Sequence, residues 1–247
     1  MKNHFNNLAR NWDKNLITKN RTDAIAEELR KIFPFKKITT IMQIKKSFLW
    51  VIFFGSLIGL NETLIGSFNI PYRSVVLSSI TLAILSVARY QLPKFGTSLL
   101  IIGIAVLYKI NSVGVHSCTT NFLLCGPMAL LILGTGYEIF SYFLIAKKPF
   151  SYLNFVLVCG ITSIVAFGIF AVMNTYVLSV WDTSRLSEYI YVRAPLTAII
   201  SGILCVLTLY AVMAFKNVKV ARLNPSLIQA LLGSVIIGLW LFGYFAA

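Results

Sequence analysis

A carboxylate inside a long apolar stretch is the first feature of this chain that points to chemistry. Glu62 lies in FGSLIGLNETLIG, residues 54–66, where almost every other side chain is apolar or small. At about 100° per residue in a helix, Glu62 shares one narrow face with Gly55, Gly59 and Gly66. Glycines let a second helix approach closely, and an ionisable group in hydrocarbon is costly unless it is buried and partnered. This face therefore predicts a helix contact that is also a candidate binding site.

A second acid lies on a similar face of a later apolar segment. At helical spacing, Glu138 shares a face with Pro127, Leu131, Gly134 and Ser141. We expect the two acidic faces to pack together and to enclose a pocket for a cationic or hydrogen-bonding solute. The residues expected to line it are Glu62, Glu138, Gly59 and Gly134. The alternative is a packing seam in which protonated acids hydrogen-bond to each other.

The polar connection at residues 111–126 is expected to cover the mouth of that pocket. It contains His116, which is either a further ligand for the solute or a solvated side chain. The chain has only 2 histidines and few acids, so neither a metal nor a cofactor is predicted. Cys118 and Cys125 either form a disulfide or stay free. The other cysteines lie in apolar segments and are expected to be packing residues: Cys159 and Cys205.

Composition predicts the elements that must position these residues. Of the 247 residues, 57% are hydrophobic and only 12% are charged, which is typical of an all-α, polytopic integral membrane helix bundle. About seven transmembrane helices are expected, at residues 47–69, 74–92, 97–112, 122–146, 151–179, 194–215 and 226–246. The second and third are short for a crossing of about 20 residues. A re-entrant hairpin would place Arg89 and Lys94 in hydrocarbon, so we expect two crossings, with Arg89 and Lys109 reaching the interfaces.

Charge then predicts the orientation. The net charge is +14, and the basic residues are concentrated in residues 1–46 and in every second connection after them. By the positive-inside rule the N-terminus is inside and the C-terminus outside. The expected location is the plasma membrane, with several crossings. The outer connection at residues 180–193 contains Trp181, Tyr189 and Tyr191, and we interpret it as an interfacial aromatic belt around a surface helix.

Residues 1–41 differ from the bundle at residues 42–247. They form a basic soluble or interfacial segment, with a predicted helix that ends at Pro34. Residues 1–31 resemble the extreme N-terminus of class I S-adenosylmethionine-dependent methyltransferases, through Phe5, Ala9, Trp12, Asp13, Arg21, Ala24 and Ala26. The glycine-rich turn that binds the cofactor in that family does not follow. We therefore expect a fused leader without methyltransferase activity.

The membrane part, over about residues 47–146, resembles the S components of energy-coupling factor vitamin transporters and related uncharacterised membrane proteins. The resemblance lies in GSLIGLNETLIG, NIPYR, ARYQLPKFG and the loop that ends in Cys125-Gly126-Pro127. S components usually have six helices, so a seventh is a departure. The resemblance implies capture of a small solute from outside. It also implies two kinds of partner, a coupling membrane subunit and ATPases.

The first hypothesis is thus a solute-binding transport subunit in the lipid bilayer. The second is a structural or assembly protein whose glycine and glutamate faces pack against a partner helix, and the third is an inactive methyltransferase-derived fusion. No enzyme is expected, because the sequence contains no Walker A, HExxH or GxSxG motif. The basic N-terminal segment has no RNA- or DNA-binding motif, so nucleic acid is not an expected partner.

Overall fold

The computed structural model describes residues 35–68, 70–113, 120–145, 150–179, 181–217 and 225–246. The chain divides into two compact units, Met1–Lys46 and Ser47–Ala247. The predicted helix before Pro34, the methyltransferase-like segment, His116 and Cys118 lie outside the described residues, and so does the side chain of Cys125. The second unit contains both of the acids that the sequence singles out.

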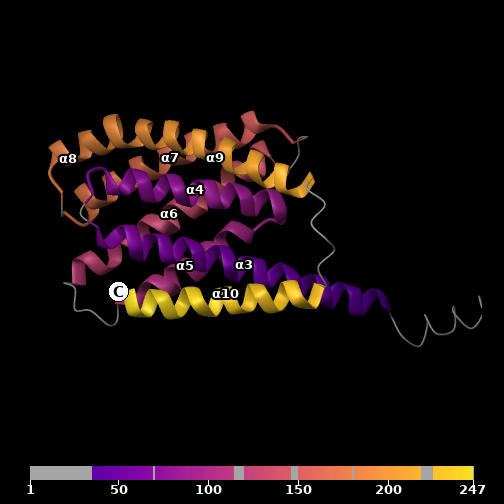
Figure 1. The fold of residues 1–247 in the computed structure, drawn as a ribbon. Coiled ribbons are helices and arrows are strands. Elements are labelled where there is room, and N and C mark those ends of the chain that lie inside the picture. The colour runs from indigo at the N-terminus through magenta and orange to yellow at the C-terminus, as the bar shows by residue number, and fades with distance from the viewer. Residues whose placement is uncertain are drawn as a thin grey trace, which may run out of the picture. The chain divides into compact units, whose positions relative to one another are not determined.

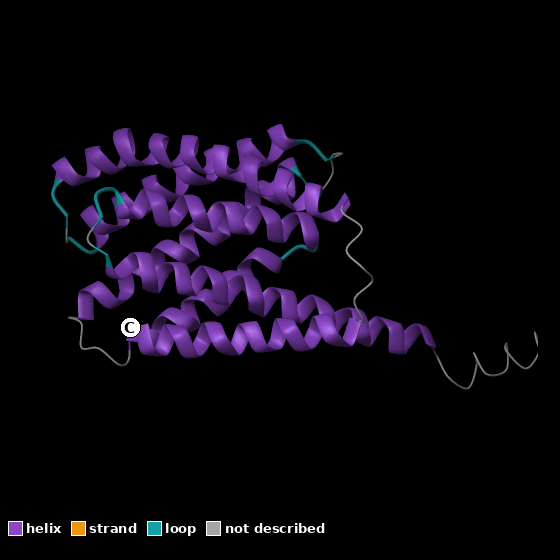
Figure 2. Ribbon diagram, viewed as in Figure 1, coloured by secondary structure: helices purple, strands orange, loops and turns teal. Residues whose placement is uncertain are grey.

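The described part of the chain is helical and contains no strand, so the predicted all-α class is confirmed (Figure 2). Each predicted apolar segment corresponds to one long helix (Figure 1). The long helices are α3 (Phe35–Ser67), α4 (Arg73–Gln91), α5 (Thr97–Val113), α6 (Thr120–Leu144), α7 (Tyr152–Val172), α9 (Ala194–Asn217) and α10 (Pro225–Ala246). Between α7 and α9 lie the short helix α8 (Thr183–Glu188) and two π-helical turns, η1 (Met173–Val177) and η2 (Tyr189–Arg193).

Five stretches of helix are long and apolar enough to cross a membrane, counting the described residues only. They are Ser47–Gly66, Arg73–Gln91, Gly126–Leu144, Tyr152–Val177 and Thr183–Ala214. Two further apolar helices are shorter, Thr97–Ile110 and Gln229–Gly243. The lengths of the five are those that a hydrocarbon layer of about 30 Å requires, so the fold is compatible with a membrane protein.

Successive long helices are joined at alternating ends of the unit Ser47–Ala247 (Figure 1). One end carries the connection between α4 and α5, residues 92–96, and we call it the turn end. The other end carries the connection between α3 and α4 together with η1, α8 and η2, and we call it the α8 end. The two ends hold different groups of polar side chains.

Helix α5 lies between the two glycine-containing faces that the sequence predicts. A Cβ added at Gly59 would lie 2.6 Å from Cβ of Tyr108, and one added at Gly134 would overlap Ile102. Both Tyr108 and Ile102 belong to α5. The predicted direct packing of the Glu62 face against the Glu138 face is therefore wrong, because each face packs against α5.

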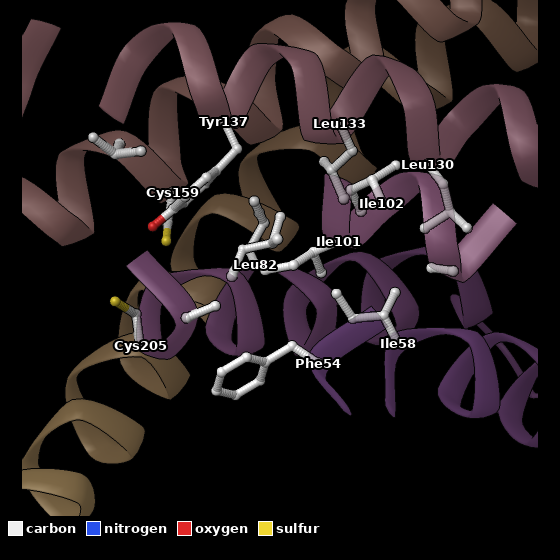
Figure 3. Close-up of a cluster of buried hydrophobic side chains, with 14 of the residues drawn as sticks. Phe54, Ile58, Leu82, Ile101, Ile102, Leu130, Leu133, Tyr137, Cys159 and Cys205 are labelled. Atoms are coloured by element: carbon white, nitrogen blue, oxygen red, sulfur yellow. The ribbon is translucent and has the colours of Figure 1, made fainter. Parts of the chain in front are cut away.

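The apolar core shows the same arrangement. Figure 3 places Ile101 and Ile102 of α5 between Ile58 of α3 and Leu133 of α6, and all four side chains are buried. Residues of α4, α7 and α9 extend the same core cluster. Helix α5 is thus a central element of the bundle although it is one of the two short apolar helices.

The last helix, α10, packs against α3 and α5 through polar contacts. The Tyr108 hydroxyl donates to the Leu239 carbonyl at 2.6 Å, and the Trp240 indole donates to the Ser56 hydroxyl at 2.8 Å. The rings of Tyr108 and Trp240 meet edge to face, with centroids 4.9 Å apart. These contacts give the seventh long helix a defined place in the unit.

Close approach of α3 and α5 makes a first testable prediction. At Gly55 a Cβ would lie 2.7 Å from the backbone oxygen of Ile101, so Gly55→Ala must push α5 away. We expect it to lower the free energy of unfolding by about 1–3 kcal/mol. Gly103→Ala is the matched control, since no atom lies within 4 Å of its Cβ position. It should raise stability by about 0.5–1 kcal/mol through helix propensity.

The measurement is thermal unfolding of both purified variants in one detergent. If Gly55→Ala is as stable as the unchanged protein, the described contact between α3 and α5 is incorrect.

Candidate functional site

Glu138 lies at the turn end and joins three helices. Its carboxylate is 1% exposed and lies 3.1 Å from Nη1 of Arg89, a buried residue of α4. It also accepts the backbone N–H of Gly96 at 2.9 Å and that of Ser98 at 3.0 Å, at the start of α5. The same Arg89 nitrogen donates to the Lys94 carbonyl at 2.8 Å. A carboxylate from α6 thus satisfies the N-terminus of α5, where backbone N–H groups have no partner within their own helix.

This environment makes Glu138 a structural residue. Both carboxylate oxygens are already hydrogen-bonded, and burial leaves no edge open to a solute. Arg89, predicted to reach the membrane interface, is instead 3% exposed and paired. The expectation of protonated acids bonded to each other is also wrong, because each acid pairs with a cation of its own.

Glu62 lies toward the α8 end, and its partner is Lys109 of α5. The Lys109 ammonium is 3.7 Å from Oε2 of Glu62 and donates to the Glu62 backbone carbonyl at 3.1 Å. The side chains of this pair are 19% and 12% exposed, for Lys109 and Glu62 respectively. Gly66 and Gly126 leave room for the lysine, since a Cβ at either would lie within 4 Å of it.

The two acids do not share a pocket. Glu138 contacts α5 at Ser98 and Glu62 contacts it at Lys109, positions separated by about 16 Å along a helix that rises 1.5 Å per residue. Helical spacing in the sequence identified a real face around each acid but assigned the wrong neighbour. A solute-binding role for Glu62, Gly59 or His116 stays a prediction.

A small pocket lies at the α8 end instead. Its volume is about 50 Å³, and it is enclosed by α4, α6, α7 and η2. The lining side chains are hydroxyl-bearing, aromatic or small and apolar: Ser74, Ser78, Ala129, Leu133, Ala166, Phe167, Phe170 and Tyr189. Concave sites with few convergent polar groups in an apolar wall are typical of small-molecule binding.

One arginine organises the polar side of this pocket. Nε and Nη2 of Arg193 donate to Oε1 of Glu188, at 3.0 and 2.8 Å. Nη1 points the other way and donates to the Ser74 hydroxyl at 3.2 Å and to the Tyr189 hydroxyl at 3.1 Å. The guanidinium also lies over the Tyr189 ring, 4.4 Å from its centroid. A single charge therefore holds two of the pocket's hydroxyl groups in place.

Aromatic rings form the rest of the wall. Tyr189 packs on Trp181 with ring centroids 4.3 Å apart, and it lies 5.9 Å from the ring of Phe167. Phe170 meets Trp181 edge to face at 5.5 Å. The sequence predicted an interfacial aromatic belt here. The structure turns Tyr189 inward, whereas Tyr191 is 78% exposed.

The backbone around the pocket is irregular. Tyr72 and Ser179 have positive φ values, 55° and 52°, which cost roughly 1–2 kcal/mol for a residue with a side chain. Both lie at the α8 end, as do η1 and η2. Strained residues and π-helical turns occur preferentially at functional sites. This end of the unit therefore has two independent signs of a site, a pocket and a strained backbone.

Helix α8 has a conventional start. The Asp182 carboxylate accepts the Arg185 backbone N–H at 3.0 Å and the Ser184 hydroxyl at 2.9 Å. These two hydrogen bonds lower the pKa of Asp182 from its ordinary value. The cap fixes where the chain leaves the connection and enters α8.

A third group of polar side chains lies in the core. The Tyr137 hydroxyl donates to the Ser86 hydroxyl at 3.1 Å, and the Ser86 hydroxyl lies 3.3 Å from the Cys159 sulfur. Figure 3 shows Cys159 beside Tyr137, and Cys205 on a neighbouring helix. Both cysteines are buried free thiols, in keeping with the packing role expected of them. Among the residues described, no group of three or more His, Cys, Asp or Glu side chains could hold a metal ion.

An apolar groove of about 710 Å³ runs along the surface between α7 and α9. Its small residues are Gly160, Ala198 and Gly202, and nothing lies within 4 Å of a Cβ placed at Gly160. Branched aliphatic side chains form its walls. Small residues in an apolar helix face favour close packing of another helix.

Comparison with known proteins gives no match. No family profile, no characterised protein and no solved structure is similar to this chain. The resemblances to S components and to methyltransferases therefore stay predictions, and the site must be argued from its own geometry.

The contrast between the two acids makes a second testable prediction. Glu138→Gln removes the charge that compensates a buried arginine, so it should lower the free energy of unfolding by about 3–5 kcal/mol. Glu62→Gln alters a partly exposed pair and should cost less than about 1 kcal/mol. Thermal unfolding in detergent compares the two. Equal losses of stability would mean that Glu138 is not the structural residue described.

Proposed function

We propose that this protein binds a small solute in the pocket at the α8 end and acts as the solute-capturing subunit of a membrane transport system. The observation that carries the proposal is the pocket of about 50 Å³, where hydroxyl groups held by Arg193 meet aromatic rings. Elsewhere the acids of α3 and α6 are already paired with cations. This pocket therefore takes the place of the Glu62–Glu138 seam as the candidate binding site.

The orientation that we propose places the pocket outside the cell. The seven long helices cross the plasma membrane in alternating directions, with the turn end inside. In support, Lys94 is exposed at the turn end, and basic residues are favoured on the cytoplasmic side. A solute then enters from outside between α4, α6 and α7.

Energy for transport would come from other subunits. The sequence contains no nucleotide-binding motif of the Walker A type, so a coupling membrane subunit and ATPases are the partners that we propose. No chemical step on the solute is part of this proposal. The resemblance to S components suggests the same division of labour.

A structural or assembly role is the second candidate, and the groove between α7 and α9 favours it. A partner helix could pack against Gly160, Ala198 and Gly202, where side chains of this chain leave space. The glycines that the sequence suggested for this role, Gly55 and Gly59, are already packed against α5. An assembly protein has no need of the pocket at the α8 end, and that difference separates the two candidates.

The test is to fill the pocket. Ala129 lines it, so Ala129→Leu should occupy its space and abolish solute binding while the fold is kept. Ala211→Leu is the matched control, because Ala211 lies on an exposed face of α9. Mass spectrometry of small molecules that copurify with the full chain should find a solute with the unchanged protein and with Ala211→Leu. It should be absent with Ala129→Leu.

A copurified solute that persists in Ala129→Leu would show that binding takes place elsewhere. If all three proteins purify without a solute but with the same protein partner, the assembly role replaces the proposed one.

A further inference from the structure

We propose that the pocket at the α8 end selects a small monocarboxylate, with acetate as the smallest compound that presents both a carboxylate and an apolar group. This inference rests on the proposed function and adds the chemical class of the solute. It is carried by the size of the pocket, the direction of its hydroxyl groups and the placement of the one cation beside it.

Size sets the first limit. The pocket volume is about 50 Å³. A buried water requires about 10–15 Å³ measured in this way, so the pocket holds roughly four non-hydrogen atoms. Acetate has that number. An engineered cavity that binds benzene is about 150 Å³, which makes an aromatic solute too large.

Hydrogen-bond direction sets the second limit. The hydroxyl oxygens of Ser74 and Tyr189 accept hydrogen bonds from Nη1 of Arg193. A hydroxyl that accepts in this way still has its own proton to donate. Both residues line the pocket, and Ser78 supplies a third hydroxyl. The pocket therefore presents donors, and it suits a group that only accepts hydrogen bonds, as an ionised carboxylate does.

Charge sets the third limit. Glu188 occupies the Nε and Nη2 edge of Arg193, whereas Nη1 points to the pocket-lining hydroxyls. Of the described side chains that line the pocket, none is acidic. The positive end of the Arg193–Glu188 pair therefore faces the pocket, and hydrogen bonds to an anion there are strengthened by charge.

A cationic solute is disfavoured for the same reason. Aromatic rings attract cations, and Phe167, Phe170 and Tyr189 would otherwise make a suitable cage. The Tyr189 ring, however, is already covered by the Arg193 guanidinium at 4.4 Å. A second cation beside it would be repelled. The apolar wall at Ala129 and Leu133 instead fits the methyl group of a short carboxylate.

The experiment compares three probes of equal size and shape, acetate, acetamide and acetamidinium, which carry negative, zero and positive charge. Saturation-transfer NMR of the probe's methyl group measures binding to the full chain in detergent at constant ionic strength. We expect acetate to bind at least tenfold more tightly than either isostere. Tyr189→Phe and Ser78→Ala should each weaken acetate binding about tenfold.

Matched controls are available for both variants. Ser79→Ala removes a buried hydroxyl from the next position of α4, outside the pocket lining, and Tyr191→Phe removes one from an exposed ring. Neither should change acetate binding. Acetate binding that ignores Ser78→Ala and Tyr189→Phe is adventitious and overturns the inference, as does failure of acetate to bind.

Tighter binding of acetamide or acetamidinium, lost in Tyr189→Phe, would also overturn the carboxylate assignment but would leave the solute-binding function standing. The function itself fails only if the copurified solute is indifferent to Ala129→Leu. The two claims are therefore tested by separate results.

Discussion

The buried ion pair between Arg89 and Glu138 is the interaction on which the rest of the bundle depends. A charge in an apolar interior is stable only when it is paired and hydrogen-bonded, so neither residue can be there without the other. Because Glu138 also accepts two backbone N–H groups at the start of α5, the pair fixes α4, α5 and α6 at one end. Helix α5, too short to be an obvious membrane span, is held in the centre by this contact and by the close approach of glycines from α3 and α6.

The candidate site depends on the same helices at their other end. α4 and α6 leave the turn end in fixed positions, are linked to α7 by the buried hydroxyl and thiol groups of Ser86, Tyr137 and Cys159, and meet η2 around the pocket. The polar groups of the unit thus serve two purposes. Those at the turn end and in the core satisfy one another, whereas the hydroxyls beside Arg193 are directed at a space that side chains do not fill. Such a division is expected of a protein that needs a rigid bundle and one adaptable binding end.

The sequence predicted the elements well and their neighbours poorly. Helical spacing identified the seven long helices and the face shared by Gly59 and Glu62, because hydrophobic periodicity is a local property. It could not tell that α5 lies between α3 and α6, since a face does not name its partner. Arg89 was predicted to be an interfacial cation, although an arginine and a glutamate in neighbouring antiparallel segments could have suggested a pair. The pocket was missed because Ser74 and Ser78 resemble ordinary small residues of a membrane helix, and the π-helical turn that brings Tyr189 inward has no sequence signal.

The most direct test of the central role of this ion pair is a double-mutant cycle, with Arg89→Met, Glu138→Leu and the double variant compared by thermal unfolding in detergent. Each single variant leaves an unpaired buried charge, whereas the double variant leaves none. We expect a coupling energy of about 2–3 kcal/mol, with the double variant more stable than either single one. Additive losses, or a double variant less stable than both, would contradict the claim that this pair holds α4, α5 and α6 together.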